Sequence, residues 1–169
     1  IDNFDGEYYL DNIDINKLSE SKKSKLRSSK IGIVLQDFAL IDDFTVFENV
    51  MTPLYFNKKI KDKKGSVMRA LKKTGIASLK AKKVSQLSGG QKQRVAISRA
   101  LVTNPEYIFA DEPTGSLDSK TSEEIVKMLF DLNRNGITII IVTHNLDIAN
   151  KCQRVIEIKD GNIIEDNCS

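Results

Sequence analysis

Long apolar runs and cysteines are both scarce in this sequence of 169 residues. No apolar run approaches the roughly 20 residues that a membrane-spanning helix needs, so we expect a globular protein without such a helix. The two cysteines, Cys152 and Cys168, are too few for a disulfide framework and fit a reducing cytoplasm. The first residues, IDNFDGEYYL, are acidic and lack a basic segment, which argues against a secretory signal there.

A strong excess of charge is also missing, since the net charge is only +3. Lysines do cluster at residues 58–64 and 80–83, but neither cluster alternates with aromatic side chains. The clusters therefore do not predict a platform on which bases of a single strand could stack. We expect solvated helical faces, or contact with anionic lipid headgroups as a secondary effect, and no nucleic-acid partner.

Three continuous apolar segments, at residues 31–35, 107–110 and 137–143, predict strands that are buried on both faces. Helical patterns fall between them, so the order strand, helix, strand, helix, strand favours an α/β fold with a mostly parallel sheet and helical crossovers. Residues 1–16 and the segment around Asp160-Gly161 carry the pattern of antiparallel strand pairs. A small antiparallel β element is thus expected beside the sheet.

Residues 45–85 indicate a small helical subdomain inserted between two strands of the sheet. Thr45 and Glu48 have the spacing of a capping box, which opens the first helix. Pro53 is expected to end or kink that helix. A second helix is expected over residues 65–74, with Gly75 at its C-terminal stop.

Polar side chains follow the apolar strands at the points where the strands end. Gln36 follows the first strand, Asp111 and Glu112 follow the second, and His144 follows the third. Ligands of parallel sheets collect beyond these carboxyl ends, so the four residues predict one site. The adjacent carboxylates suit a magnesium ion and an attacking water. An exposed loop is the ordinary alternative for an Asp-Glu pair, but a buried strand tolerates a carboxylate at its end poorly.

A Ser-Gly-Gly turn at residues 88–90 opens the helix that precedes the second strand. A helix start offers free backbone N–H groups and the positive end of the helix dipole, which suits an anion. Glycines also let a ligand approach the backbone closely.

These motifs resemble those of the ABC-type ATPases. LSGGQ at residues 87–91 is similar to the family's signature motif, and the strand that ends in Asp111-Glu112 is similar to its Walker B motif. The segment IGIVLQDFALIDDFTVFENV at residues 31–50 resembles the family's Q-loop, especially in macrolide exporters and lipoprotein-releasing ATPases. The resemblance implies a P-loop NTPase-like fold and the cofactors ATP and Mg²⁺.

The resemblance also implies a role for each residue of the predicted site. Asp111 would hold magnesium, Glu112 would act as the general base, and His144 would contact the terminal phosphate. Gln36 would sense both the magnesium ion and the attacking water. The loop after Gln36 would touch a membrane permease, either a separate subunit or a domain, which places the protein in the cytoplasm on the inner face of the membrane.

A second ATPase subunit is the other implied partner, packed head to tail. In that dimer the signature residues would bind the nucleotide of the partner subunit, and the D-loop would lie at the interface. The signature residues are Ser88, Gly89, Gly90 and Gln91, and the D-loop residues are Ser116 and Asp118.

One motif of the family is absent: no segment matches G-x-x-x-x-G-K-[ST], whose backbone and lysine hold phosphates. Residues 115–121 (GSLDSKT) come closest, but Ser119 stands where the second glycine is needed. We expect a partial ABC ATPase domain that lacks the first strands, the Walker A loop and the first helix, with residues 1–44 and 86–169 as its RecA-like core. Truncation of a competent ATPase is the simplest explanation, and loss of the motif in a degenerate protein is the rival.

Two classes of function therefore follow. The first is an ATP-hydrolysing subunit of a transporter that drives export or membrane extraction. The second is a non-catalytic module that docks on a permease or a partner ATPase. A soluble ABC protein acting on ribosomes or DNA repair is a weaker third, because residues 45–56 (TVFENVMTPLYF) resemble the transporter subgroup.

Overall fold

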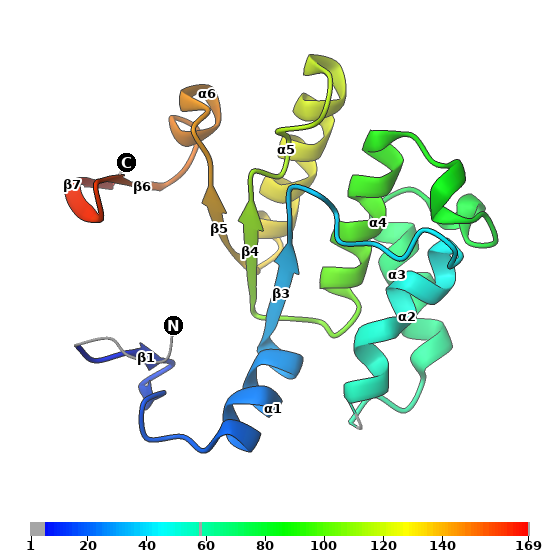
Figure 1. Cartoon of the computed structure of the whole chain (residues 1–169), viewed down its shortest axis with the longest axis horizontal. Helices are drawn as coiled ribbons and strands as arrows, with labels where there is room; N and C mark the ends of the chain where they lie inside the picture. The colour runs from blue at the N-terminus through cyan, green and yellow to red at the C-terminus, as the bar shows by residue number, and fades with distance from the viewer. Residues whose placement is uncertain (1–5, 58, 169) are drawn as a thin grey trace.

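A three-stranded parallel sheet forms the centre of the computed structural model, which describes residues 6–57 and 59–168. Its strands are β3 (Ile31–Val34), β4 (Tyr107–Asp111) and β5 (Thr138–Val142), in the order β3-β4-β5. Figure 1 shows the three arrows pointing the same way, so the carboxyl ends of the strands meet at one edge. The predicted α/β fold is confirmed. Lys58 of the first lysine cluster and the first five residues of the predicted strand pair lie outside the described residues.

Two crossover helices connect the strands. Helix α4 (Gly89–Leu101) packs on β3 and leads into β4, and helix α5 (Ser119–Arg134) leads from β4 to β5. Val34, Ile108 and Ala110 are buried on the face that these helices cover. Alternate residues of each strand thus enter the core, as the pleat of a strand requires.

The prediction that the strands are buried on both faces is wrong. Ile33 is 52% exposed and Val142 is 60% exposed, while Phe109 and Ile140 are also open to solvent. Right-handed crossovers that advance in one direction along a sheet place their helices on the same side. Because β3, β4 and β5 follow each other in chain order, α4 and α5 share one face, and the apolar side chains of the other face remain accessible.

The segment between β3 and α4 is helical. It contains α2 (Val46–Phe56), α3 (Lys63–Lys73) and the 3₁₀ turns η1 (Ala77–Leu79) and η2 (Val84–Gln86). The predicted capping box is confirmed, because the Glu48 backbone N–H donates to Thr45 Oγ1 at 3.2 Å and the Thr45 N–H donates to Glu48 Oε2 at 2.7 Å. Thr45 also pairs with Lys83 in an isolated antiparallel bridge. The two ends of the helical segment therefore meet.

Pro53 does not end α2, so the first of its two predicted effects, ending the helix rather than kinking it, is wrong. A proline inside a helix leaves the carbonyl four residues earlier without its usual N–H donor. Here the Thr52 hydroxyl donates to the Asn49 carbonyl at 2.6 Å and supplies that missing hydrogen bond. The helix therefore continues to Phe56.

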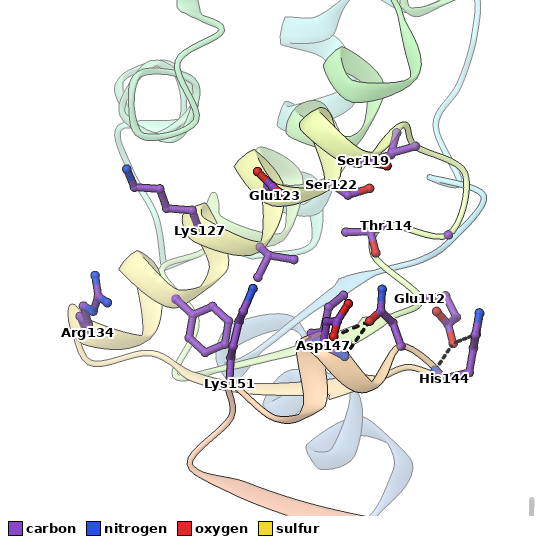
Figure 2. Close-up of a pocket in the computed structure, with 16 residues that line it drawn as sticks. Glu112, Thr114, Ser119, Ser122, Glu123, Lys127, Arg134, His144, Asp147 and Lys151 are labelled. Carbon is purple, nitrogen blue, oxygen red and sulfur yellow. Dashed lines mark hydrogen bonds and ion pairs between the residues drawn. The ribbon is translucent and has the colours of Figure 1, made fainter.

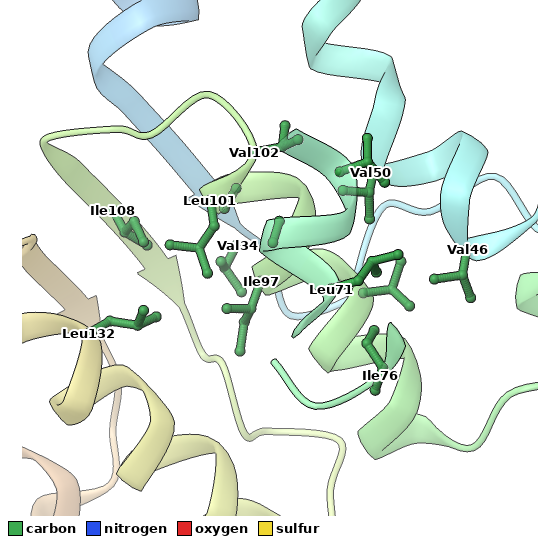
Figure 3. Packing of buried hydrophobic residues seen from close by; sticks show 14 of the residues in the cluster. Val34, Val46, Val50, Leu71, Ile76, Ile97, Leu101, Val102, Ile108 and Leu132 are labelled. Carbon is green, nitrogen blue, oxygen red and sulfur yellow. The ribbon is translucent and has the colours of Figure 1, made fainter. Parts of the chain in front are cut away.

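One core joins the helical segment to the covered face of the sheet. Figure 3 shows Leu71, Val46 and Val50 of the helical segment, which belong to the same hydrophobic cluster as Ile97 of α4 and Ile108 of β4. Each of these five side chains is fully buried. The helical segment is thus anchored to the sheet through α4.

Smaller elements lie outside this core. The pair β1 (Tyr9–Leu10) and β2 (Ile13–Asp14), helix α1 (Glu20–Lys30) and helix α6 (Leu146–Ala149) flank the sheet, followed by the hairpin β6 (Arg154–Lys159) and β7 (Asn162–Cys168). The predicted hairpin turn is confirmed, since Asp160 and Gly161 both have positive φ, 49° and 78°. In the described part of the chain, no helix has the length and apolar character to cross a membrane.

Candidate functional site

The Glu112 carboxylate is the most tightly held group at the carboxyl edge of the sheet. Glu112 Oε1 accepts hydrogen bonds from the His144 backbone N–H at 2.8 Å and pairs with His144 Nδ1 at 2.7 Å. The Thr143 hydroxyl donates to Glu112 Oε2 at 3.1 Å. The loop after β5 therefore fixes the carboxylate that follows β4, as the sequence predicted for residues at adjacent strand ends.

The backbone and the charge of Glu112 both fit a functional position. Its φ is +40°, a left-handed conformation that costs a non-glycine residue about 1–3 kcal/mol and clusters at active sites. Burial raises the pKa of Glu112, but the hydrogen bonds from His144 and Thr143 outweigh burial and leave the pKa below its ordinary value. The carboxylate is thus ionised at neutral pH, as a general base must be.

His144 and Glu112 differ in their access to solvent. The His144 side chain is 87% exposed, whereas the Glu112 side chain is 18% exposed. Figure 2 places this pair at one end of a cavity of about 700 Å³, with Arg134 at the opposite end. Lys127 and Lys151 also line this cavity, together with the acidic side chains of Glu123 and Asp147.

Gln36 approaches the loop that follows Glu112. A Cβ atom placed on Gly115 would lie only 3.0 Å from Gln36 Nε2 and 3.5 Å from Glu112 Cβ. Because glycine has no side chain, the Gln36 amide can approach this loop closely at position 115. Gly115 and Thr143 were not predicted as site residues, although each lies next to a predicted motif, in PTGSLD and directly before His144.

Asp111 ends β4 with its residue exposed, and its carboxylate makes no hydrogen bond or ion pair within residues 6–57 and 59–168. The described residues contain no group of three His, Cys, Asp or Glu side chains that could hold a metal. Magnesium fits this arrangement, because it is usually bound by one or two protein carboxylates together with phosphate oxygens and water. Asp111 and the side-chain oxygen of Gln36 are the residues present that suit it.

The four predicted signature residues form the start of α4 rather than part of the cavity. Ser88 is the N-cap, and its hydroxyl accepts from the Gln91 N–H at 3.3 Å while Gln91 Oε1 accepts from the Ser88 N–H at 3.2 Å. This is a capping box, whose S-x-x-Q pattern was visible in the sequence. The remaining N–H groups of the helix start stay available to a ligand.

The glycines of this turn have a packing role that the sequence analysis missed. A Cβ atom on Gly90 would collide with Thr121 Cγ2 at 2.4 Å, and one on Gly89 would lie 3.3 Å from Leu117 Cδ2. The absence of a side chain at these two glycines thus allows the start of α4 to pack against the segment that begins α5. The same absence lets a ligand approach the backbone.

Asp118 caps helix α5. Its carboxylate accepts from the Thr121 N–H at 3.0 Å and from the Thr121 hydroxyl at 2.6 Å, and these bonds lower its pKa. Ser119, the next residue, is already the first residue of the helix. The ionised aspartate is favoured because it accepts two hydrogen bonds at the positive end of the helix dipole.

Comparison with known proteins identifies the family of this site. The model of the ABC transporter family matches residues 2–115. The ABC transporter ATP-binding protein YvrO of Bacillus subtilis is 45% identical over 162 residues, which cover 95% of this chain and 71% of that protein. The chain belongs to the ABC transporter ATP-binding family.

Other members of the ABC family extend the comparison. MJ0796 of Methanocaldococcus jannaschii is 46% identical over 165 residues, covering 94% of this chain and 70% of that protein. A dimeric structure of MJ0796, described as a post-hydrolysis state bound to ADP and Pi, matches with a TM-score of 0.85 over 97% of this chain and 73% of the MJ0796 chain. The chain is therefore an ABC ATP-binding component of a transporter.

The relatives also include fused proteins. The macrolide export ATP-binding/permease protein MacB of Chlorobaculum tepidum is 40% identical over 161 residues. The match covers 95% of this chain but only 25% of MacB. This chain therefore corresponds to about a quarter of the length of MacB.

Proposed function

We propose that the protein hydrolyses ATP, with Glu112 as the general base that polarises the attacking water. The observation that carries this proposal is the fixed position of the Glu112 carboxylate, held by His144 and Thr143 at the carboxyl edge of the sheet. Three hydrogen bonds and a lowered pKa keep the carboxylate ionised and oriented, and a general base must be held within hydrogen-bond reach of the water that it activates.

The neighbouring residues divide the other tasks of phosphoryl transfer. We assign Asp111 and Gln36 to Mg²⁺, which would neutralise phosphate charge when bound. His144 has an exposed ring beside the Glu112 carboxylate, so it is placed to contact a terminal phosphate. Gln36, close to Gly115, can follow changes in the loop that carries Glu112.

We also propose that two such subunits pack head to tail. The signature residues 88–91 start a helix with free N–H groups but do not line the cavity beside Glu112. They would therefore serve the nucleotide of a second subunit, with Asp118 and Ser116 near the interface. The dimeric form reported for MJ0796 supports this arrangement.

A membrane permease is the second proposed partner. Ile41 and Phe44, in the loop after Gln36, are 45% and 40% exposed and offer an apolar surface for it. We propose that residues 45–85 form the helical subdomain beside this loop and that residues 1–44 and 86–169 form the core. The similarity to MacB favours export or membrane extraction, driven from the cytoplasmic face of the membrane.

Replacing the base tests the proposal. Glu112→Gln keeps the side-chain shape and an oxygen that can accept the His144 N–H, but it removes the ionised base. In the full-length protein we expect steady-state ATP hydrolysis to fall by about 10²–10⁴-fold, while the affinity for ATP, measured by equilibrium titration, stays close to the wild-type value.

Glu123→Gln is the matched control, because Glu123 lines the same cavity from α5 and has no proposed role. This variant should hydrolyse ATP at the wild-type rate. Equal rates for wild type and Glu112→Gln would overturn the assignment of Glu112 as the base.

A non-catalytic binding module is the second candidate, and one observation favours it: the 169 residues contain no G-x-x-x-x-G-K-[ST] segment. We expect this chain alone to bind Mg-ATP weakly, because no cradle of backbone N–H groups and lysine holds the phosphates. Titration with a fluorescent ATP analogue and magnesium checks this expectation. Restored binding in the full-length protein supports the ATPase, whereas absence of binding there supports the non-catalytic module.

A further inference from the structure

The turn after Gln36 has a strained backbone conformation that contacts from other parts of the chain must stabilise. Phe38 and Ala39 both have left-handed backbones, with φ of 63° and 44°. Neither residue is a glycine, asparagine or aspartate, the types that adopt this conformation most readily. Strained residues of this kind persist only when the surrounding structure holds them.

Arg99 of helix α4 supplies that support. Its Nη2 donates to the Phe38 carbonyl at 2.8 Å, and its Nη1 donates to the Ala39 carbonyl. A guanidinium is a planar fork with several N–H donors, so one side chain can serve two consecutive carbonyls that a left-handed turn exposes. Burial lowers the pKa of Arg99 and the nearby Asp37 charge opposes that effect, which marks the group as partly withdrawn from water.

The same helix holds the loop that follows Glu112. Gln93 is buried, and its Nε2 donates to the Pro113 carbonyl at 2.7 Å. The Gln93 Oε1 atom is buried and has no hydrogen-bond partner within the described residues. The hydrogen bond to Pro113 is thus the one that holds this amide, while the other end of the amide carries the cost of an unmade hydrogen bond.

Helix α4 is itself seated firmly on the sheet. A Cβ atom on Gly32 of β3 would lie 2.7 Å from the Ala100 carbonyl oxygen, so backbone and helix are in direct contact there. The N-terminus of α4 is the signature segment 88–91. One rigid helix thus connects that segment to the two loops that carry Gln36 and Glu112.

We propose that Arg99 and Gln93 are positioning residues, which fasten the turn after Gln36 and the loop after Glu112 to helix α4. Through them, neither loop can shift without α4 and the signature segment at its start. The effect of this connection on catalysis rests on the roles proposed above for Gln36 and Glu112. The attachment of the two loops to helix α4 does not depend on those roles.

Hydrogen exchange of the nucleotide-free full-length protein tests the fastening directly. Arg99→Met should speed exchange of the amides of residues 37–40 by about tenfold or more, because charge-assisted hydrogen bonds hold that turn. Gln93→Met, which has nearly the same volume, should speed exchange of residues 114–117 and leave residues 37–40 unchanged. Each variant is therefore a control for the other.

Arg94→Met is the matched control on the same helix. Arg94 donates to the Thr74 carbonyl at 3.0 Å and to Glu124 at 2.7 Å, so it makes similar bonds to a different region. Its loss should leave both loops at wild-type exchange rates. If Arg99→Met does not fold, Arg99→Lys keeps the charge without the fork and should give a smaller acceleration in the same residues.

Wild-type exchange in both loops of folded Arg99 and Gln93 variants would overturn the proposal, and so would equal acceleration by Arg94→Met. ATP hydrolysis then tests whether the fastening affects catalysis. We expect Arg99→Met to lower kcat more than it raises KM for ATP. Faster exchange with an unchanged kcat would leave the fastening established and would count against the role proposed for Gln36.

Discussion

The two faces of the central sheet differ although the same strands build them. On one face, Val34 and Ile108 are fully buried beneath α4 and α5. On the other, Ile33 and Val142 are more than half exposed. The residues are alike in polarity on both faces, so composition alone does not account for the difference.

Topology explains it instead. Each crossover advances by one strand in the same direction, and a right-handed connection then always passes on the same side. A strand rich in isoleucine and valine is typical of a parallel sheet covered on both sides, but the cover comes from whichever helices the connections supply. In this chain the two connections supply one layer.

The largest expected effect comes from the covered face. Ile108→Ala removes a fully buried side chain beneath the crossover helices and leaves a cavity that close-packed neighbours cannot fill. We expect the free energy of unfolding to fall by about 2–5 kcal/mol, measured by urea denaturation of this 169-residue chain. A loss below about 1 kcal/mol would mean that this face is not packed as described.

The same substitution on the open face is the matched comparison. Ile33→Ala on the adjacent strand removes a side chain that is already 52% exposed. We expect a loss of less than about 1 kcal/mol, measured by the same denaturation of this 169-residue chain. If Ile33→Ala costs as much as Ile108→Ala, another part of the protein covers this face in solution.

The smallest expected effect is the loss of stability at acidic pH that comes from Glu112, at the carboxyl edge of the sheet. The pKa of Glu112 in the folded chain lies below its ordinary value of 4.5, so its stabilising contribution is complete above pH 4.5 and is lost as the pH falls further. Wild type should therefore lose slightly more stability than Glu112→Gln between pH 5 and pH 3. Thermal unfolding of both proteins across that range checks the sign, and parallel curves would contradict it.

Much of the fold could be predicted because local signals decide it. The capping box of Thr45 and Glu48 and the turn at Asp160-Gly161 both depend on residues a few positions apart. The continuation of α2 through Pro53 could not, because it depends on the rotamer with which the Thr52 hydroxyl reaches the Asn49 carbonyl. The exposure of Ile33 likewise depends on the path of distant connections.

In the candidate site too, some features could be predicted from the sequence and others could not. The strand ends predicted that Glu112 and His144 lie at one edge, and the structure adds the hydrogen bonds that join them. The hydrogen bonds from Arg99 could not be predicted from sequence motifs, because Arg99 and Phe38 are 61 positions apart and belong to no common motif. The functional roles of these residues remain predictions until the variants are measured.

The bridge between Thr45 and Lys83 also bears on how the chain folds. Pairing β3 with β4 joins residues far apart in sequence, and closing such a long loop slows folding. When the helical segment forms first and its ends meet at this bridge, the distance along the chain that β3 and β4 must still close is much shorter. We predict that this segment forms before the sheet and acts as a folding unit, which high φ-values confined to residues 45–83 would show.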